Sequence, residues 1–156
     1  MKTTNKKISQ LVLITAMMFI SSLLIAQTDP IHKSATDLVK EAKQQIENLT
    51  PQQVQEELSK GNVTLIDLRE SEELKQNGII AGSVHAPRGM LEFYADPSLP
   101  YHKPAFNKNN RIILHCASGG RSALAAVTLK QMGYENIAHL DGGFKAWKES
   151  GKPVIK

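Results

Sequence analysis

The sequence contains very little cysteine: Cys116 is the only one among its 156 residues. A single thiol excludes an internal disulfide. Three roles are left for it, namely a buried inert side chain, a cross-link between two molecules, or a reactive nucleophile. Cysteines in oxidising compartments usually pair, so an unpaired thiol in an exported chain would need a specific reason.

An excess of positive charge is also nearly absent once the N-terminus is set aside. The formal net charge is +4, but residues 1–26 contain three lysines and no acidic residue. Without this segment, the 19 basic residues fall to 16 against 15 acidic ones, which leaves a net charge of +1. The rest of the sequence has no clustered basic stripe, so nucleic acid is not an expected partner.

The sequence lacks a metal-ligand pattern as well. His85, His102, His115 and His139 follow no spacing that is typical of a metal site, and no second cysteine supplements them. No pair of carboxylates has a spacing that indicates acid–base catalysis. We therefore expect no metal ion and no organic cofactor.

The sequence has only one long apolar run, from Leu11 to Ala26, and this run follows a lysine-containing start. A positive start, a short apolar stretch and a small residue at its end are typical of a secretory signal peptide. The run has 16 residues and is interrupted by Ser21 and Ser22, whereas a membrane-spanning helix needs roughly 20 apolar residues. The sequence therefore predicts an exported protein, periplasmic or secreted.

We expect cleavage after Ala26, although Leu24 occupies a position where a small residue is preferred. The alternative is an uncleaved anchor, which is the only case in which we expect a membrane partner. No cysteine stands directly after the run, which excludes a lipoprotein anchor. The expected organisation is a signal peptide at 1–26, a linker and helix at 27–49, and a single domain at 50–156.

Strand and helix patterns alternate between residues 50 and 150. Two helix starts carry capping signals: Ser34 begins a helix over 34–48, and Thr50 begins the next one. The alternation predicts an α/β fold with a central parallel sheet flanked by helices on both faces. Strands are predicted at 62–70, 83–87, 111–115 and 136–140. Further helices are predicted at 71–77, 121–132 and 142–151, with a helical turn at 88–94.

Cys116 stands at the carboxyl end of the strand predicted at 111–115, which is where ligands bind in parallel sheets. A glycine-containing loop follows, and a helix begins at about Arg121. Free N–H groups at a helix start attract negative charge, and glycines let such groups converge. A thiol beside them loses its proton more easily. This pattern indicates a nucleophile that carries an anionic group, and the alternative is a small, buried, inert cysteine.

Four nearby residues are candidates for substrate contact. Arg121 adds a fixed cation with several donors, and its unfavourable place at a helix start is explained if an anion lies beside it. Ser118 has a hydroxyl in the loop, whereas Ser122 either binds substrate or satisfies the helix start. Arg88 follows a strand and either approaches the site or is a solvated loop residue.

Four separated segments of the sequence share a pattern with one family: "LIDLRE" at 65–70, "NGIIAGSVHAPRGML" at 77–91, "CASGGRSALAA" at 116–126 and "HLDGGFKAWKESGKPV" at 139–154. Together they resemble the rhodanese-like sulfurtransferase domains. The resemblance covers about residues 50–155 and implies an α/β fold and sulfur transfer through a persulfide on Cys116. It implies a structural role, bracing loops near the site, for Asp67 and Arg69.

The same resemblance implies partners and a binding loop. The partners are a small-molecule sulfur donor of the thiosulfate type and a thiophilic acceptor, either cyanide or a thiol, including the thiol of an acceptor protein. The amides of residues 117 to 121 are expected to cradle the persulfide or the incoming donor. The expected substrate-binding residues are Ala117, Ser118, Gly119, Gly120, Arg121, Ser122 and Arg88.

Two features keep alternatives open. Ile79 and Ala81 stand where the family usually has a histidine and a proline, which weakens the match of that turn and leaves the chemistry intact. Phosphatases and arsenate reductases of related fold have five residues between cysteine and arginine, whereas this sequence has four, a smaller cradle that suits sulfur better than a phosphoryl group. A non-catalytic binding or redox-sensing module of the same fold is the other alternative.

Overall fold

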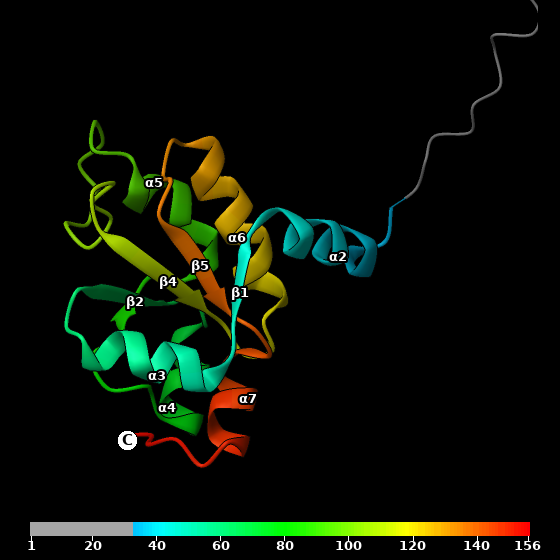
Figure 1. Ribbon diagram of the computed structural model, residues 1–156. Helices are drawn as coiled ribbons and strands as arrows, with labels where there is room; N and C mark the ends of the chain where they lie inside the picture. The colour runs from blue at the N-terminus through cyan, green and yellow to red at the C-terminus, as the bar shows by residue number, and fades with distance from the viewer. Residues whose placement is uncertain (1–32) are drawn as a thin grey trace, which may run out of the picture. The chain divides into compact units, whose positions relative to one another are not determined.

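The computed structural model describes residues 33–156, so the predicted signal peptide and its cleavage point lie outside the described residues. Residues Ser34–Lys156 form one compact unit. Its centre is a five-stranded sheet in the order β1-β5-β4-β2-β3, and every pair of neighbouring strands is parallel (Figure 1). The strands are β1 (Glu47–Leu49), β2 (Val63–Asp67), β3 (Val84–His85), β4 (Arg111–His115) and β5 (Ile137–Leu140).

Helices cover both faces of this sheet, which confirms the predicted α/β architecture. One face packs on α5 and α6, and the other packs on α3 and α7 (Figure 1). Helix α2 packs on α6, and α4 connects β2 to β3. The helices are α2 (Ala35–Gln45), α3 (Pro51–Ser59), α4 (Ser71–Asn77), α5 (Leu91–Ala95), α6 (Gly120–Gln131) and α7 (Gly143–Glu149), with a 3₁₀ turn at Arg88–Met90.

The predicted helix starts are confirmed at the level of individual hydrogen bonds. The hydroxyl of Ser34 accepts from the Asp37 N–H, and the Asp37 carboxylate accepts from the Ser34 N–H. Thr50 and Gln53 exchange the equivalent pair of bonds at the start of α3. Reciprocal bonds of this kind satisfy N–H groups that have no partner within the helix.

The structure corrects the helix that the sequence predicts over residues 34–48. Helix α2 ends at Gln45, and Glu47–Leu49 form β1, an edge strand that pairs with β5. The side-chain amide of Asn48 donates to the carbonyls of Lys43 and Ile46, at 2.8 and 3.1 Å. These bonds satisfy carbonyls that a helix end leaves unpaired, so the side chain of Asn48 caps the end of α2 where the chain turns into β1.

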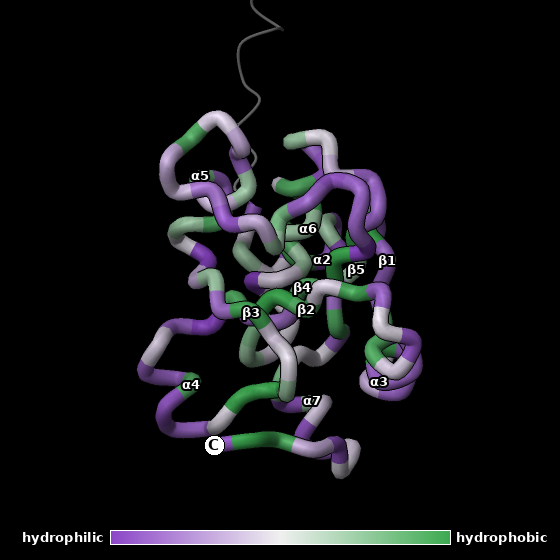
Figure 2. The backbone as a smooth tube through the Cα atoms, turned by 90° about the vertical axis from the view of Figure 1, so that its left-hand side faces the viewer, coloured by the Kyte–Doolittle hydropathy of each residue, from purple (hydrophilic) through white to green (hydrophobic). Residues whose placement is uncertain are grey.

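The core consists of two apolar layers, one on each face of the sheet. Figure 2 shows hydrophobic segments gathered at the central strands, whereas α4 at the periphery is largely hydrophilic. Phe144 and Trp147, three residues apart, lie on one face of α7 and are both buried there. Over residues 33–156, none of the helices is both long and apolar enough to cross a bilayer.

Candidate active site

Cys116 directly follows β4, at the carboxyl end of the sheet, as predicted. Cys116 is 1% exposed, and it packs in the apolar layer between the sheet and α6. Its Sγ accepts a hydrogen bond from the N–H of Gly119 at a distance of 3.2 Å. The thiol is therefore covered, but a backbone donor at the start of α6 points at it.

The loop between Cys116 and α6 has a conformation that only glycine adopts easily. Gly119 has a φ of +91° and occupies the N-cap of α6. A Cβ on this residue would lie 3.0 Å from the Gly142 nitrogen. Glycine at this position lets the two backbones approach closely, and its own N–H donates to the sulfur.

A second glycine loop, between β5 and α7, braces the cysteine loop from behind. The N–H groups of Phe144 and Lys145 donate to the carbonyls of Cys116 and Ala117, at 2.8 and 3.0 Å. Gly143 has a φ of +61°, and a Cβ there would lie 2.5 Å from the Cys116 carbonyl oxygen. These bonds hold two carbonyls of the cysteine loop on the side of α7, which keeps them from competing for the donors that face the sulfur.

Arg121 is the second residue of α6, and its guanidinium forms a bidentate ion pair with Glu73 of α4. The two hydrogen bonds measure 2.8 and 2.7 Å. These bonds to Glu73 raise the pKa of Arg121 most, and Cys116 contributes less in the same direction. The sequence predicts an anion beside this unfavourably placed cation. The structure supplies that anion from the protein itself.

Ser122 belongs to a buried chain of polar groups. The Oδ1 of Asn48 lies 2.9 Å from Nε2 of His139, and the Ser122 hydroxyl lies 3.1 Å from Nδ1. Burial lowers the pKa of His139 to about 4, so the ring is neutral at pH 7. Because the Asn48 amide nitrogen donates elsewhere, Nε2 carries the proton, and the lone pair of Nδ1 and the Gly119 carbonyl share the single proton of the Ser122 hydroxyl. The hydroxyl, which is also 3.1 Å from the Gly119 carbonyl oxygen, is thus occupied within the protein.

Asp67 and Arg69 form a buried ion pair beneath the site, in line with the structural role that the sequence predicts. The two residues are 0% and 1% exposed, and the guanidinium makes three hydrogen bonds to the carboxylate. Arg69 also donates to the Gly78 carbonyl, and its guanidinium carbon lies 3.9 Å from the centre of the Phe144 ring. The pair therefore supports the start of α7, which braces the cysteine loop.

His115 precedes the nucleophile candidate and is completely buried. Neither ring nitrogen has a hydrogen-bond partner among the described residues, although Nε2 lies 3.5 Å from an Asp67 carboxylate oxygen. Burial lowers the pKa of His115 to about 4, against the opposing charge of Asp67. The ring stacks on Phe144, so the side chain acts as a neutral core residue.

The remaining predicted site residues are spread over two places. Ala117, Ser118 and Gly120 lie in the cysteine loop or at the start of α6, and Ser118 is exposed. Arg88 instead pairs with Glu92 of α5 and lies 3.4 Å from the Thr128 hydroxyl. Thr128 is eight residues into α6, about 12 Å along the helix axis. The contacts of Arg88 thus point away from the cysteine loop, and its role in substrate binding stays a prediction.

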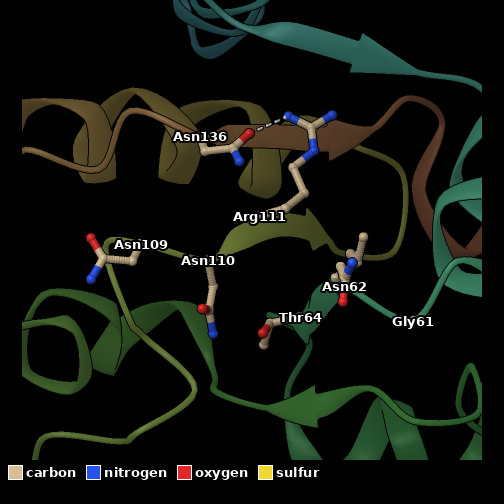
Figure 3. Close-up of a pocket in the computed structure, with 8 residues that line it drawn as sticks. Gly61, Asn62, Thr64, Asn109, Asn110, Arg111 and Asn136 are labelled. Carbon is tan, nitrogen blue, oxygen red and sulfur yellow. Dashed lines mark hydrogen bonds between the residues drawn. The ribbon is translucent and has the colours of Figure 1, made fainter.

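A pocket of about 600 Å³ lies at the opposite end of the parallel strands, where β2 and β4 begin. Figure 3 shows Arg111 and Asn136 on one side of it and Asn110 and Thr64 on another. The Arg111 guanidinium is engaged by Glu57, Glu47 and Asn136. Because Cys116 follows the other end of β4, this pocket is separate from the thiol.

A model of the rhodanese-like domain matches residues 50–150. The chain belongs to the rhodanese-like family. The matched segment of this rhodanese-like chain includes the whole cysteine loop and the bracing loop before α7, while α2 and β1 precede it. Across residues 33–156, no three histidine, cysteine or acidic side chains come close enough to hold a metal ion.

Some proteins similar to this chain are named as sulfurtransferases, and others are named as phosphatases. A sulfurtransferase of Allochromatium vinosum is 30% identical over 94 residues, which is 60% of this chain and 79% of that protein. The dual specificity phosphatase Cdc25 of Arabidopsis thaliana is 32% identical over 104 residues, 61% of this chain and 68% of that one. A solved Rhodopseudomonas palustris protein of unknown function, described as a possible tyrosine phosphatase, has a TM-score of 0.75 and 37% identity, covering 83% of this chain and all of that one.

Three contributors to the site lie outside the predicted set: Glu73, His139 and Gly143. The sequence predicts Glu73 only as part of a helix, and His139 as part of a strand and as one of four histidines without metal-ligand spacing, because nothing local marks the partners of either residue. The paired glycines before Phe144 are a local signal of a strained turn, and they are the feature from which a bracing loop is predictable.

Proposed function

We propose that this protein is a sulfurtransferase that moves a sulfane sulfur from a donor of the thiosulfate type to a thiophilic acceptor, through a persulfide on Cys116. The observation that carries the proposal is the Gly119 N–H that donates to Sγ at the start of a twelve-residue helix. A backbone donor in this position offers a hydrogen bond to negative charge that develops on the sulfur atoms during the reaction.

The first half-reaction forms one S–S bond and breaks another. The Cys116 thiolate attacks the outer sulfur of thiosulfate, and sulfite leaves with the electron pair of the broken bond. The product is a persulfide whose outer sulfur carries the negative charge. That charge lies near the start of α6, where unpaired N–H groups offer hydrogen bonds without rearrangement.

The second half-reaction returns the enzyme to its starting state. The acceptor, cyanide in an assay or a thiolate, attacks the outer sulfur of the persulfide, and the Cys116 thiolate leaves. The electron pair of the broken S–S bond stays on Sγ, where the Gly119 N–H again stabilises it. The same backbone N–H groups serve both half-reactions, because the negative charge moves only between two adjacent sulfur atoms.

Sulfur loading tests the proposal directly. We expect the chain treated with thiosulfate, and then freed of it, to gain the mass of one sulfur atom, and to lose it on addition of cyanide with release of thiocyanate. Intact-mass spectrometry measures both steps. A chain that never gains sulfur is not a transferase and is better described as a non-catalytic binding or redox-sensing module.

The phosphatase alternative is tested on the same preparation. Two of the similar proteins bear phosphatase names, but four residues separate Cys116 from Arg121 here, and the sequence-based argument favours sulfur over a phosphoryl group in such a loop. Hydrolysis of p-nitrophenyl phosphate is expected to be no faster than in a Cys116→Ser variant. Faster, cysteine-dependent hydrolysis without sulfur loading would favour a phosphatase.

We further propose that the chain is exported and cleaved after Ala26. The support is the sequence pattern alone, a lysine-containing start followed by a short apolar run. Expression in a host with a secretion pathway is expected to yield a mature chain that begins at Gln27 in the exported fraction. N-terminal sequencing measures this, and a full-length chain in the membrane fraction would indicate an uncleaved anchor instead.

A further inference from the structure

The ion pair between Arg121 and Glu73 changes the electrostatics of the proposed site. Arg121 is a neighbour of Cys116, and its charge is the cation that an anionic donor would meet there. Both guanidinium nitrogens that bond Glu73 do so at ordinary hydrogen-bond distances. The positive charge next to the sulfur is therefore compensated before any substrate arrives.

Glu73 is held in this position by more than one group. Its Oε2 also accepts from the Glu70 N–H at the start of α4, at 2.9 Å. The hydrogen bonds from Arg121 lower the pKa of Glu73 most, and Arg69 adds a smaller effect in the same direction. The carboxylate is thus ionised at neutral pH and anchored to its own helix.

The exposure of these side chains places the ion pair on the side of the thiol that faces solvent. Cys116 is 1% exposed, whereas the side chains of Arg121 and Glu73 are 35% and 30% exposed. A donor that approaches the sulfur past Arg121 therefore meets a carboxylate as well as a guanidinium. Its negative charges are attracted by one group and repelled by the other.

We propose that Glu73 makes this site select sulfane-sulfur donors with a single negative charge, such as organic thiosulfonates or persulfides, over dianionic thiosulfate. The inference rests on the proposed persulfide chemistry at Cys116. Repulsion by a fixed carboxylate grows in proportion to the charge of the donor. The second charge of thiosulfate is therefore penalised, whereas a donor with one charge is admitted.

Two sulfur donors that react in the same way but differ in net charge can test whether the charge of the donor matters. Methanethiosulfonate differs from thiosulfate in having a methyl group in place of one charged oxygen. In both cases the Cys116 thiolate attacks the outer sulfur, the S–S bond breaks, and a sulfinate or sulfite leaves with the electron pair. A difference between the two donors therefore reports how the site treats the extra charge.

The experiment measures kcat and KM for both donors, with cyanide as acceptor, in the wild-type chain and in Glu73→Gln. Glutamine keeps an oxygen that can accept from Glu70 and Arg121 but has no charge. Since repulsion scales with donor charge, a KM that falls about threefold for methanethiosulfonate is expected to fall about tenfold for thiosulfate. We expect kcat to change much less than KM for either donor.

Two further variants separate charge from positioning. Glu73→Asp keeps the charge but shortens the reach to Arg121, and we expect it to keep the wild-type ratio of kcat/KM for the two donors. Glu72→Gln removes a charge from the same helix, at an exposed side chain paired with Lys75, and is expected to leave both donors unchanged.

Each result decides the inference. The inference is supported if the ratio of kcat/KM for the two donors shifts toward thiosulfate in Glu73→Gln but not in the other two variants. Equal changes for both donors in Glu73→Gln and Glu73→Asp would overturn it, because Glu73 would then only orient Arg121. If the wild-type chain takes no sulfur from either donor, the proposed function itself fails and the inference fails with it.

Discussion

Replacing Cys116 by serine is expected to reduce kcat/KM for sulfur transfer from thiosulfate to cyanide by more than about a thousandfold. Cys116 is the only thiol in the chain, so no neighbouring sulfur can replace it. A serine hydroxyl stays protonated at neutral pH and is a weak nucleophile without an activating base. Thiocyanate formation measures the rate, and intact mass shows whether any sulfur is still loaded.

The substitution is expected to leave the fold unchanged, which makes the loss interpretable. A serine oxygen at residue 116 can accept the same Gly119 N–H, and because it is smaller than sulfur it fits without a steric clash. The urea midpoint of the variant serves as the control, together with the activity of Ser59→Ala on the exposed end of α3. A Cys116→Ser chain that keeps a tenth of the activity would place the chemistry elsewhere.

Much of the fold is predictable because its signals are local. The caps at Ser34 and Thr50, and the glycine that ends α4, depend on residues within one or two turns of one another. Such signals are present in the sequence whatever the rest of the chain does. The alternation of these elements then leaves a parallel sheet with helices on both faces as the economical arrangement.

The strand β1 shows where local reasoning ends. Ile46 and Leu49 extend the apolar stripe of the preceding helix, so a helical pattern through residue 48 is the natural reading. The choice is made instead by tertiary partners, because Leu49 is buried against β5 and Asn48 bonds both His139 and the end of α2. A three-residue edge strand has no sequence signal of its own strong enough to override the helix.

The same limit applies to the candidate site. Cys116, the glycine at 119 and the helix start are adjacent in sequence, so their arrangement is predictable from spacing. Glu73 lies 48 residues from Arg121, and Asn48 lies 91 residues from His139. Neither pairing has a periodicity or a motif that marks it, and both depend on how the sheet orders its strands.

Asp67→Asn is expected to lower the free energy of unfolding by about 3–5 kcal/mol, because it leaves the buried Arg69 without a compensating charge. Both side chains are almost completely excluded from water. The asparagine amide is close in shape to the carboxylate, so the loss reflects charge rather than a cavity. Urea unfolding followed by the fluorescence of Trp147, the only tryptophan and 1% exposed, measures the change.

Two comparisons assign the loss to an uncompensated charge. Glu72→Gln removes a carboxylate from an exposed pair with Lys75, and its urea midpoint is expected to stay near that of the wild type. The double variant Asp67→Leu with Arg69→Met leaves no charge buried and is expected to be more stable than Asp67→Asn alone. An Asp67→Asn chain as stable as Glu72→Gln would contradict this account of the ion pair.

The ion pair also connects stability to the site. Arg69 lies over the ring of Phe144, and the Phe144 N–H holds the Cys116 carbonyl. If an unpaired Arg69 moves toward water, Phe144 loses its neighbour and the cysteine loop loses part of its brace. Asp67→Asn is therefore expected to slow sulfur loading even at urea concentrations where the chain is still folded. Unchanged loading in the folded variant would show that the brace does not depend on the ion pair.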